Sequence, residues 1–149
     1  MTQQSPLNKR AGFTIIEVVI TVGIVAILLA ITFPFLLNML NRFDTRSDAQ
    51  IFVALLREAQ SRSFANKYEL NHGVYIADSE FVLFAGDSFS SRDESLDEEY
   101  ARSSAVSVTG GTEYVFSRKS GKTDAQSTNF SSGGLDMAVE TNSEGRINW

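Results

Sequence analysis

The chain changes its pattern of apolar and polar residues twice. Val18 to Leu37 is a run of twenty residues without a charge, rich in Val, Ile, Leu and Phe. No second run of this kind follows, so the sequence predicts one membrane-spanning helix and excludes a protein with several spans. From Phe13 to Leu40 such a helix would measure about 42 Å at 1.5 Å per residue. This exceeds the roughly 30 Å of hydrocarbon in a bilayer, so the helix is expected to project beyond it.

The apolar period after this run is that of an amphipathic helix. Apolar residues recur at i, i+3, i+4 and i+7, which predicts one buried stripe formed by Phe52, Leu55, Leu56 and Ala59. Polar residues are expected on the other side, at Arg46, Gln50, Arg57 and Gln60. No Gly or Pro interrupts residues 35–66, so one helix is predicted from about Thr14 to Phe64. Glu58 and Arg62 form an i,i+4 pair on its solvated face.

Beyond Asn66 the pattern becomes that of short strands separated by turns. Segments 73–77 and 80–85 flank Asp78-Ser79 and predict a tight hairpin. Further strands are expected at 105–109, 113–117, 135–141 and 146–149, and residues 86–104 are expected to form a charged, mobile loop. The predicted fold class is therefore α+β, with a long amino-terminal helix packed on one small antiparallel sheet. The expected organisation is a leader at 1–12, a membrane or filament-core helix at 13–40, its amphipathic continuation at 41–66 and a β-rich exported domain at 67–149.

The charge balance argues against broad binding of nucleic acid. The net charge is −5, and the acidic residues concentrate beyond residue 68. Binding to a phosphate backbone needs clustered Lys and Arg. The chain has no cysteine, which excludes disulfides and thiolate metal sites.

Motifs for catalysis or cofactor binding are incomplete. Ser120-Gly121-Lys122-Thr123 lacks the first Gly of a phosphate-binding loop, because that position is Phe116. His72 is the only histidine and is expected to be a surface turn residue rather than a ligand or base. The acidic run Asp93–Glu99 lacks the spacing of a compact calcium loop and is expected to be solvated. No catalytic residue, metal or cofactor is therefore expected, and the protein is predicted not to be an enzyme.

Glu17 is a charge at the edge of the apolar segment. A carboxylate at membrane depth costs a few kcal/mol and persists only with a partner or a function. One interpretation places Glu17 among the cytoplasmic headgroups, where it reaches water. The other pairs it with a cation. If the peptide bond after Gly12 were cut, the new α-amino group of Phe13 on a neighbouring, axially staggered chain would supply that cation.

The segment from Lys9 to Val18 resembles the cleavage and methylation motif of type IV prepilins and type II secretion pseudopilins. Gly12, Phe13 and Glu17 match that motif position by position. The resemblance implies that a prepilin peptidase cuts after Gly12 and methylates Phe13, and that Glu17 sets the axial register of assembly. Pro34 stands where this family often has a helix-weakening proline. The basic leader before the span favours a cytoplasmic amino terminus in a bacterial inner membrane, with the rest of the chain outside.

The exported part is similar to the GspH/FimT group of minor pseudopilins and pilins. The similarity rests on Tyr114-Val115-Phe116 followed by Gly121, and on the final segment Asn142–Ile147 with its Gly145-Arg146 turn. It implies a structural subunit of a type II secretion or type IV pilus filament. The implied partners are other pilin or pseudopilin subunits, an inner-membrane platform protein and an assembly ATPase.

Two alternatives remain. Some FimT-like pilins capture DNA for natural transformation through a Gly-Arg-x-x-x-Arg segment, and here the second Arg is absent. A basic patch of four residues with Trp149 for stacking is the candidate contact: Arg118, Lys119, Lys122 and Arg146. Given the acidic domain, nucleic acid is the less favoured partner. The other alternative is an uncleaved single-span anchor unrelated to pili, for which Gly12-Phe13 and Glu17 would be coincidences.

Overall fold

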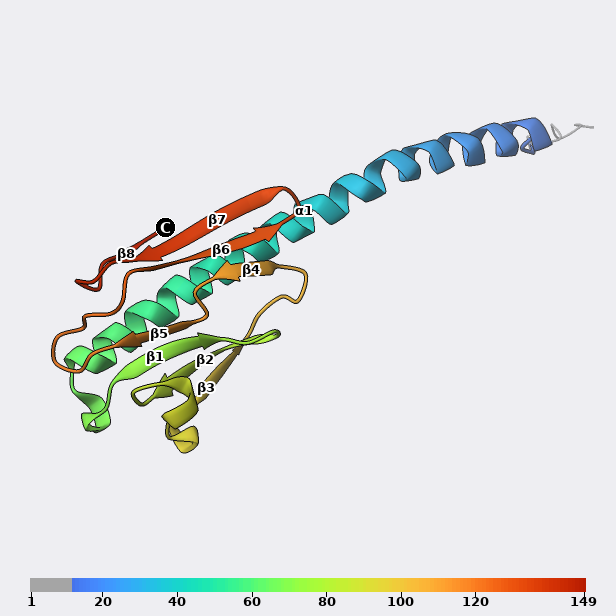
Figure 1. The fold of residues 1–149 in the computed structure, drawn as a ribbon. Coiled ribbons are helices and arrows are strands. Elements are labelled where there is room, and N and C mark those ends of the chain that lie inside the picture. Colours follow the sequence, from blue (N-terminus) through green and yellow to red (C-terminus); the bar gives the residue numbers. More distant parts are fainter. Residues whose placement is uncertain (1–11) are drawn as a thin grey trace, which may run out of the picture. The chain divides into compact units, whose positions relative to one another are not determined.

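The computed structural model describes residues 12–149, apart from the side chain of Pro34. The described chain forms two compact units, the first ending at Leu36 and the second beginning at Leu37. Helix α1 (Ile15–Phe64) contributes to both units. The predicted long helix is confirmed, beginning one residue later than expected (Figure 1). Within the described residues, it is the one helix long and apolar enough to cross a membrane.

The first unit, residues 12–36, has almost all of its apolar side chains exposed. The large hydrophobic residues from Ile15 to Leu36 are each about half or more exposed. The two threonines in this stretch bond back to the helix: the hydroxyl of Thr21 donates to the carbonyl of Val18, and that of Thr32 to the carbonyl of Leu28. Because these hydroxyls are already satisfied, they do not oppose transfer of the helix into lipid. Pro34 lies within α1, and the expectation that it weakens the helix rests on a side chain outside the described part.

The second unit packs the remainder of α1 against two antiparallel sheets. The first sheet has the order β3-β2-β1-β5 and the second the order β4-β6-β7-β8. The strands of the first sheet are β1 (His72–Ile76), β2 (Glu80–Ala85), β3 (Glu98–Ala101) and β5 (Glu113–Phe116). Those of the second are β4 (Ser107–Gly110), β6 (Gln126–Ser132), β7 (Leu135–Thr141) and β8 (Ile147–Asn148). Short 3-10 helices lie at η1 (Lys67–Glu69), η2 (Phe89–Ser91) and η3 (Glu94–Leu96).

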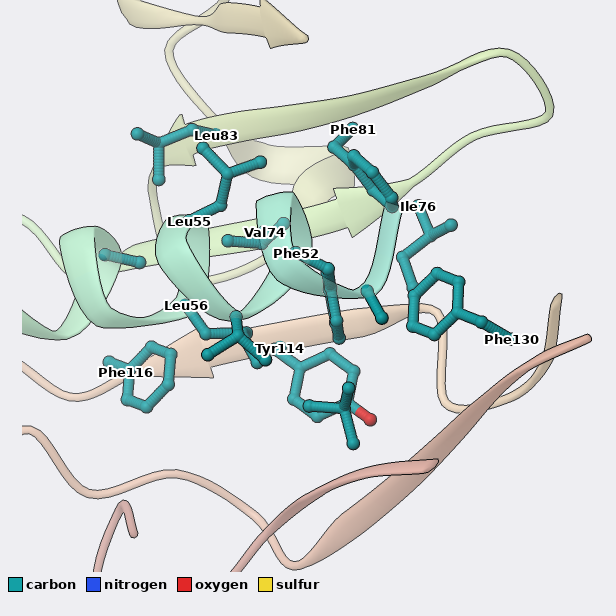
Figure 2. Close-up of a cluster of buried hydrophobic side chains, with 14 of the residues drawn as sticks. Phe52, Leu55, Leu56, Val74, Ile76, Phe81, Leu83, Tyr114, Phe116 and Phe130 are labelled. Atoms are coloured by element: carbon teal, nitrogen blue, oxygen red, sulfur yellow. The ribbon is translucent and has the colours of Figure 1, made fainter. Parts of the chain in front are cut away.

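Phe52 lies at the centre of the core, between α1 and both sheets. Its ring centroid lies 5.6 Å from that of Phe81 and 5.4 Å from those of Tyr114 and Phe130. Phe81 and Tyr114 belong to the first sheet and Phe130 to the second, so this one helical residue contacts both layers (Figure 2). The predicted stripe is confirmed, since all four of its members are buried: Phe52, Leu55, Leu56 and Ala59.

The α+β class and the hairpin of β1 and β2 are confirmed, with Ile76 opposite Phe81. The expectation of one sheet is wrong, because there are two. The second sheet was missed because the sequence of its long strand β6 is Gln-Ser-Thr-Asn-Phe-Ser-Ser. Only Thr128 and Phe130 of this strand are buried. A polar strand with one apolar residue on its inner face carries almost no alternating hydrophobic signal.

Residues 86–104 are not an unstructured excursion, which corrects the expectation of a mobile loop. They contain η2, η3 and strand β3, which pairs with β2. Phe89 stacks on Tyr75 at 3.9 Å and meets Phe84 edge-on at 5.7 Å. The segment thereby covers the face of the first sheet that points away from α1. Strand β2 could have predicted this cover. Phe81 to Ala85 is apolar at every position, which is the pattern of a strand buried on both faces.

Candidate functional site

The residues of the expected cleavage site lie outside the helix. Gly12, Phe13 and Thr14 precede α1, and the Phe13 side chain is 84% exposed. Nothing lies within 4 Å of the position that a Cβ on Gly12 would occupy. A peptide bond that a protease cuts has to be accessible and free of helical hydrogen bonds, and the Gly12–Phe13 bond meets both conditions. The leader residues Lys9 and Arg10 lie outside the described residues.

Thr14 caps the helix through the backbone of Glu17. The amide N–H of Glu17 donates to the Thr14 hydroxyl at 3.3 Å and to the Thr14 carbonyl at 3.1 Å. Sequence reasoning missed this cap, although Thr14-Ile15-Ile16-Glu17 has the Thr-x-x-Glu spacing of a capping box. The carboxylate of Glu17 also lies in the first turn, where the helix dipole favours negative charge. The structure thus gives Glu17 a local role in addition to the two interpretations of its charge.

The amino-terminal segment combines this capped start with a wholly exposed apolar helix. Residues 7–33 match the family model described as the prokaryotic N-terminal methylation motif. This motif supports a type IV pilin-like protein. Neither the comparison with curated proteins nor that with solved structures gave a match.

The proteins that carry this motif are structural rather than catalytic. The motif implies processing by prepilin peptidase and assembly with other pilins, and with the apolar helix it supports membrane anchoring and a place in a pilus or pseudopilus filament. The match ends at residue 33, so it concerns only the first unit. The β-rich unit has to be judged from its own geometry.

Two loops that carry the candidate basic residues lie together in the second unit. The side-chain nitrogen of Gln60 donates to the carbonyl of Gly121 at 3.1 Å and to that of Gly145 at 2.8 Å. Gln60 is half-buried between the loops, which corrects its expected place on the solvated face. This arrangement brings the loop with Arg118, Lys119 and Lys122 next to the turn with Arg146. These four basic residues and Trp149 are all exposed.

Nearby acceptors reduce the free positive charge of this surface. The ammonium of Lys122 lies 3.2 Å from a carboxylate oxygen of Glu144. The guanidinium of Arg118 donates to the carbonyl of Glu69 at 3.0 Å. The four predicted basic residues are therefore brought together, but acidic and carbonyl oxygens lie among them, unlike the uniformly basic groove of a nucleic-acid site.

The expectation of a solvated acidic run holds only in part: Asp93, Glu94 and Glu99 are exposed, whereas arginines bind Asp97 and Glu98 closely. Arg92 lies 2.7 Å from Asp97, and its guanidinium carbon lies 3.8 Å from the centre of the Phe89 ring. Arg62 binds Glu98 through two hydrogen bonds of 2.8 and 3.0 Å, and its Nε lies 2.7 Å from Glu58. The bond from Arg62 lowers the pKa of Glu98, and the same pair raises the pKa of Arg62. In residues 12–149, no group of three or more His, Cys, Asp or Glu side chains could hold a metal ion.

His72 is buried rather than exposed, which corrects the expectation of a surface turn residue. It begins β1, pairs with both β2 and β5, and is 1% exposed. Neither ring nitrogen has a hydrogen-bond partner, and the ring borders a cavity of about 190 Å³. Burial, followed by the charges of Arg62 and Lys67, lowers the pKa of His72 and favours the neutral ring. His72 belongs to a strand between β2 and β5, and Tyr68 of η1 stacks on its ring with 6.4 Å between the ring centroids.

Proposed function

We propose that this protein is a minor pilin or pseudopilin, a structural subunit of a type II secretion or type IV pilus filament. The observation that carries the proposal is the methylation motif on a helix whose apolar side chains find no partner within their own unit. The second unit already has a complete core around Phe52, so it does not need the first 36 residues to bury its apolar surface. The exposed helix is therefore available for lipid and then for neighbouring subunits.

The proposed pathway begins in the bacterial inner membrane, with the amino terminus on the cytoplasmic side. Prepilin peptidase cuts after Gly12 and methylates the new terminal Phe13. An inner-membrane platform protein and an assembly ATPase then move the subunit into the filament, and the side chain of Glu17 neutralises the amine of Phe13 on an adjacent subunit. A charge pair formed away from water is favourable only when both partners are present, so it fixes the axial register.

Assignment to the GspH/FimT group is the finer part of the proposal. The features that support it are strand β5 with Tyr114 and Phe116 buried in the core, and a closing β7–β8 hairpin whose turn contains Gly145-Arg146. In the turn, the amide of Gly145 donates to the carbonyl of Asn142 at 2.9 Å. Gly145 has φ +81° and lies against the carbonyl of Gly121, so a side chain is excluded there.

Glu17→Gln tests the assembly role. The cap uses the backbone amide of residue 17, so this variant keeps the helix start and removes only the negative charge. We expect normal membrane insertion and processing, with loss of the variant from sheared filaments by tenfold or more. Glu58→Gln is the matched control, because Glu58 lies on the same helix but in the second unit, and it should assemble normally. Normal incorporation of Glu17→Gln would contradict the register role.

DNA capture is the second candidate, because Gln60 brings the basic loop and the Gly145-Arg146 turn together. It predicts salt-sensitive binding of DNA by the full chain in detergent. The double variant Arg118→Gln/Lys119→Gln should then weaken binding and reduce its salt dependence by about two phosphate contacts. A gel shift without salt-sensitive binding would remove this candidate and leave the structural role untouched.

A further inference from the structure

A shallow amphipathic cavity lies in the second unit, between the start of its helical part and the turn that joins β6 and β7. Its volume is about 220 Å³, and it is lined by Met39, Arg42, Phe43, Arg46 and Leu135. The four helical residues are spaced i, i+3, i+4 and i+7, so they share one face of α1. Leu135 begins β7 and closes the other side.

The β6–β7 turn is shaped to approach the helix closely at this place. Gly133 has φ +58°, and a Cβ built on it would lie 2.9 Å from the carbonyl oxygen of Asn38 and 3.0 Å from the Cβ of Asn41. A larger residue would move the turn away from α1 and open the cavity. The floor is apolar and unusually exposed for the second unit: Met39 is 45% and Phe43 54% exposed.

The rim of the cavity carries two arginines without an acidic partner. Neither Arg42 nor Arg46 forms a salt bridge in the described residues, whereas Arg62, Arg92 and Arg102 each lie against carboxylates. The nearest acid in the sequence, Asp44, accepts a hydrogen bond from the Ser103 hydroxyl at 3.1 Å. Two cations beside exposed apolar side chains form a surface that matches an amphiphile with a negative head.

The sequence places this surface at the edge of the proposed membrane segment. Arg42 is the first charged residue after Glu17, and it follows Leu40 by two positions. At 1.5 Å per residue, Arg42 lies about 3 Å and Arg46 about 9 Å beyond Leu40 along the helix. The headgroup layer of a bilayer leaflet is about 5–8 Å thick. Arginine side chains extend several ångströms toward such a layer, so both guanidinium groups can reach it.

We propose that this cavity binds the headgroup of an anionic phospholipid in the outward-facing leaflet. The guanidinium groups of Arg42 and Arg46 contact the phosphate, and Met39, Phe43 and Leu135 contact the glycerol and the first acyl carbons. Arginine suits this task because its fork of N–H donors matches phosphate oxygens. Basic residues on the outward side do not follow from the bias of Lys and Arg toward cytoplasmic segments, which supports a specific use. The proposal rests on the membrane insertion of the proposed function.

The test uses the full chain in nanodiscs that contain phosphatidylglycerol and phosphatidylcholine at equal amounts, followed by mild release and native mass spectrometry. The wild-type chain should retain phosphatidylglycerol in preference to phosphatidylcholine. Near an anionic membrane surface, each arginine strengthens binding of the anionic lipid by about five-fold. Arg42→Gln/Arg46→Gln should therefore lower the retention of phosphatidylglycerol by about 25-fold. Arg57→Gln/Arg118→Gln, which removes two exposed arginines outside the lining of the cavity, should not.

Equal retention of the two lipids, or unchanged retention in Arg42→Gln/Arg46→Gln, would overturn the proposal. The proposal would also be overturned if the two arginines were required for crosslinking to an acidic face of a neighbouring subunit and had no effect on lipid retention. Carbonate extraction of the same samples tests membrane insertion separately from lipid binding. A chain that carbonate releases has no membrane insertion, and both proposals fail. A chain that resists carbonate but shows no lipid preference contradicts the lipid site alone.

Discussion

The side-chain nitrogen of Gln60 lies 2.8 Å from the carbonyl oxygen of Gly145, which joins the last turns of α1 to the turn before β8. The same nitrogen donates to Gly121 at 3.1 Å, so one amide group holds two loops that are remote in sequence. Gly121 has φ +60° and lies against the ring of Phe64. These hydrogen bonds thus join the end of the β-rich part to the helix.

Replacing Gln60 by Ala should loosen both loops and leave the core intact. Loss of two hydrogen bonds and the unpaired carbonyls left behind should cost about 1–3 kcal/mol. In hydrogen exchange of the full chain in detergent, the amides of Gly121 and Gly145 should exchange roughly ten-fold faster or more, since both are bonded within these loops. Gln50→Ala is the control, because Gln50 is exposed and on the same helix. Equal exchange in the two variants would contradict the joining role.

Arg62 should stabilise the segment that contains η3 and β3. Arg62→Gln removes the paired bonds to Glu98 and leaves that carboxylate without its partner. Because Glu98 is partly exposed, the expected loss is about 1–2 kcal/mol rather than that of a buried pair. Chemical denaturation of the detergent-solubilised chain measures it. Arg57→Gln, at an exposed arginine outside every salt bridge of the described residues, should change the free energy of unfolding by less than about 0.5 kcal/mol.

Stability should fall on mild acidification because of His72. Its pKa is lowered in the folded protein, so the unfolded chain takes up the proton first as the pH falls below about 6.5. The stabilisation is therefore complete above that pH and is lost progressively as the pH falls toward the lowered pKa of the folded protein. Burial raises the pKa of Asp48, which has the opposite sign: this group adds stability as the pH falls through its raised pKa, above the ordinary value of 3.8.

His72→Gln isolates this contribution. The variant keeps a polar side chain in the cavity but cannot titrate, so its melting temperature should fall less than that of the wild type between pH 7.5 and 5.5. The comparison concerns the slope with pH and not the absolute stability, so a general destabilisation by the substitution does not affect it. Parallel slopes for the two proteins would show that His72 does not titrate differently in the folded and unfolded states.

The sequence predicted the parts of this fold that depend on periodic burial. The helix and its buried stripe followed from the spacing of Phe52, Leu55, Leu56 and Ala59, and the β1–β2 hairpin from two apolar runs around Asp78-Ser79. Strand β6 could not be predicted in this way, because its place is set by pairing with β4 and β7 rather than by its own hydrophobicity.

The candidate site also has a part that could be predicted from the sequence and a part that could not. The methylation motif is local, so its residues could be identified from ten consecutive positions. The contact of Gln60 with Gly121 and Gly145, the burial of His72 and the pairing of Arg62 with Glu98 join residues that are distant in sequence. Each depends on the packing of strands around α1, which a single sequence does not specify. The Thr14 cap is the exception, since its Thr-x-x-Glu spacing was visible.

The central claim is that this chain is processed and assembled as a pilin-like subunit, and the mass of the protein isolated from membranes tests it most directly. The measurement is intact mass spectrometry with fragmentation of the amino terminus. The account predicts a chain that begins at Phe13 and carries one added methyl group on its α-amino nitrogen. A chain that retains Met1 and the basic segment before Gly12, with no methylated Phe13, would contradict it.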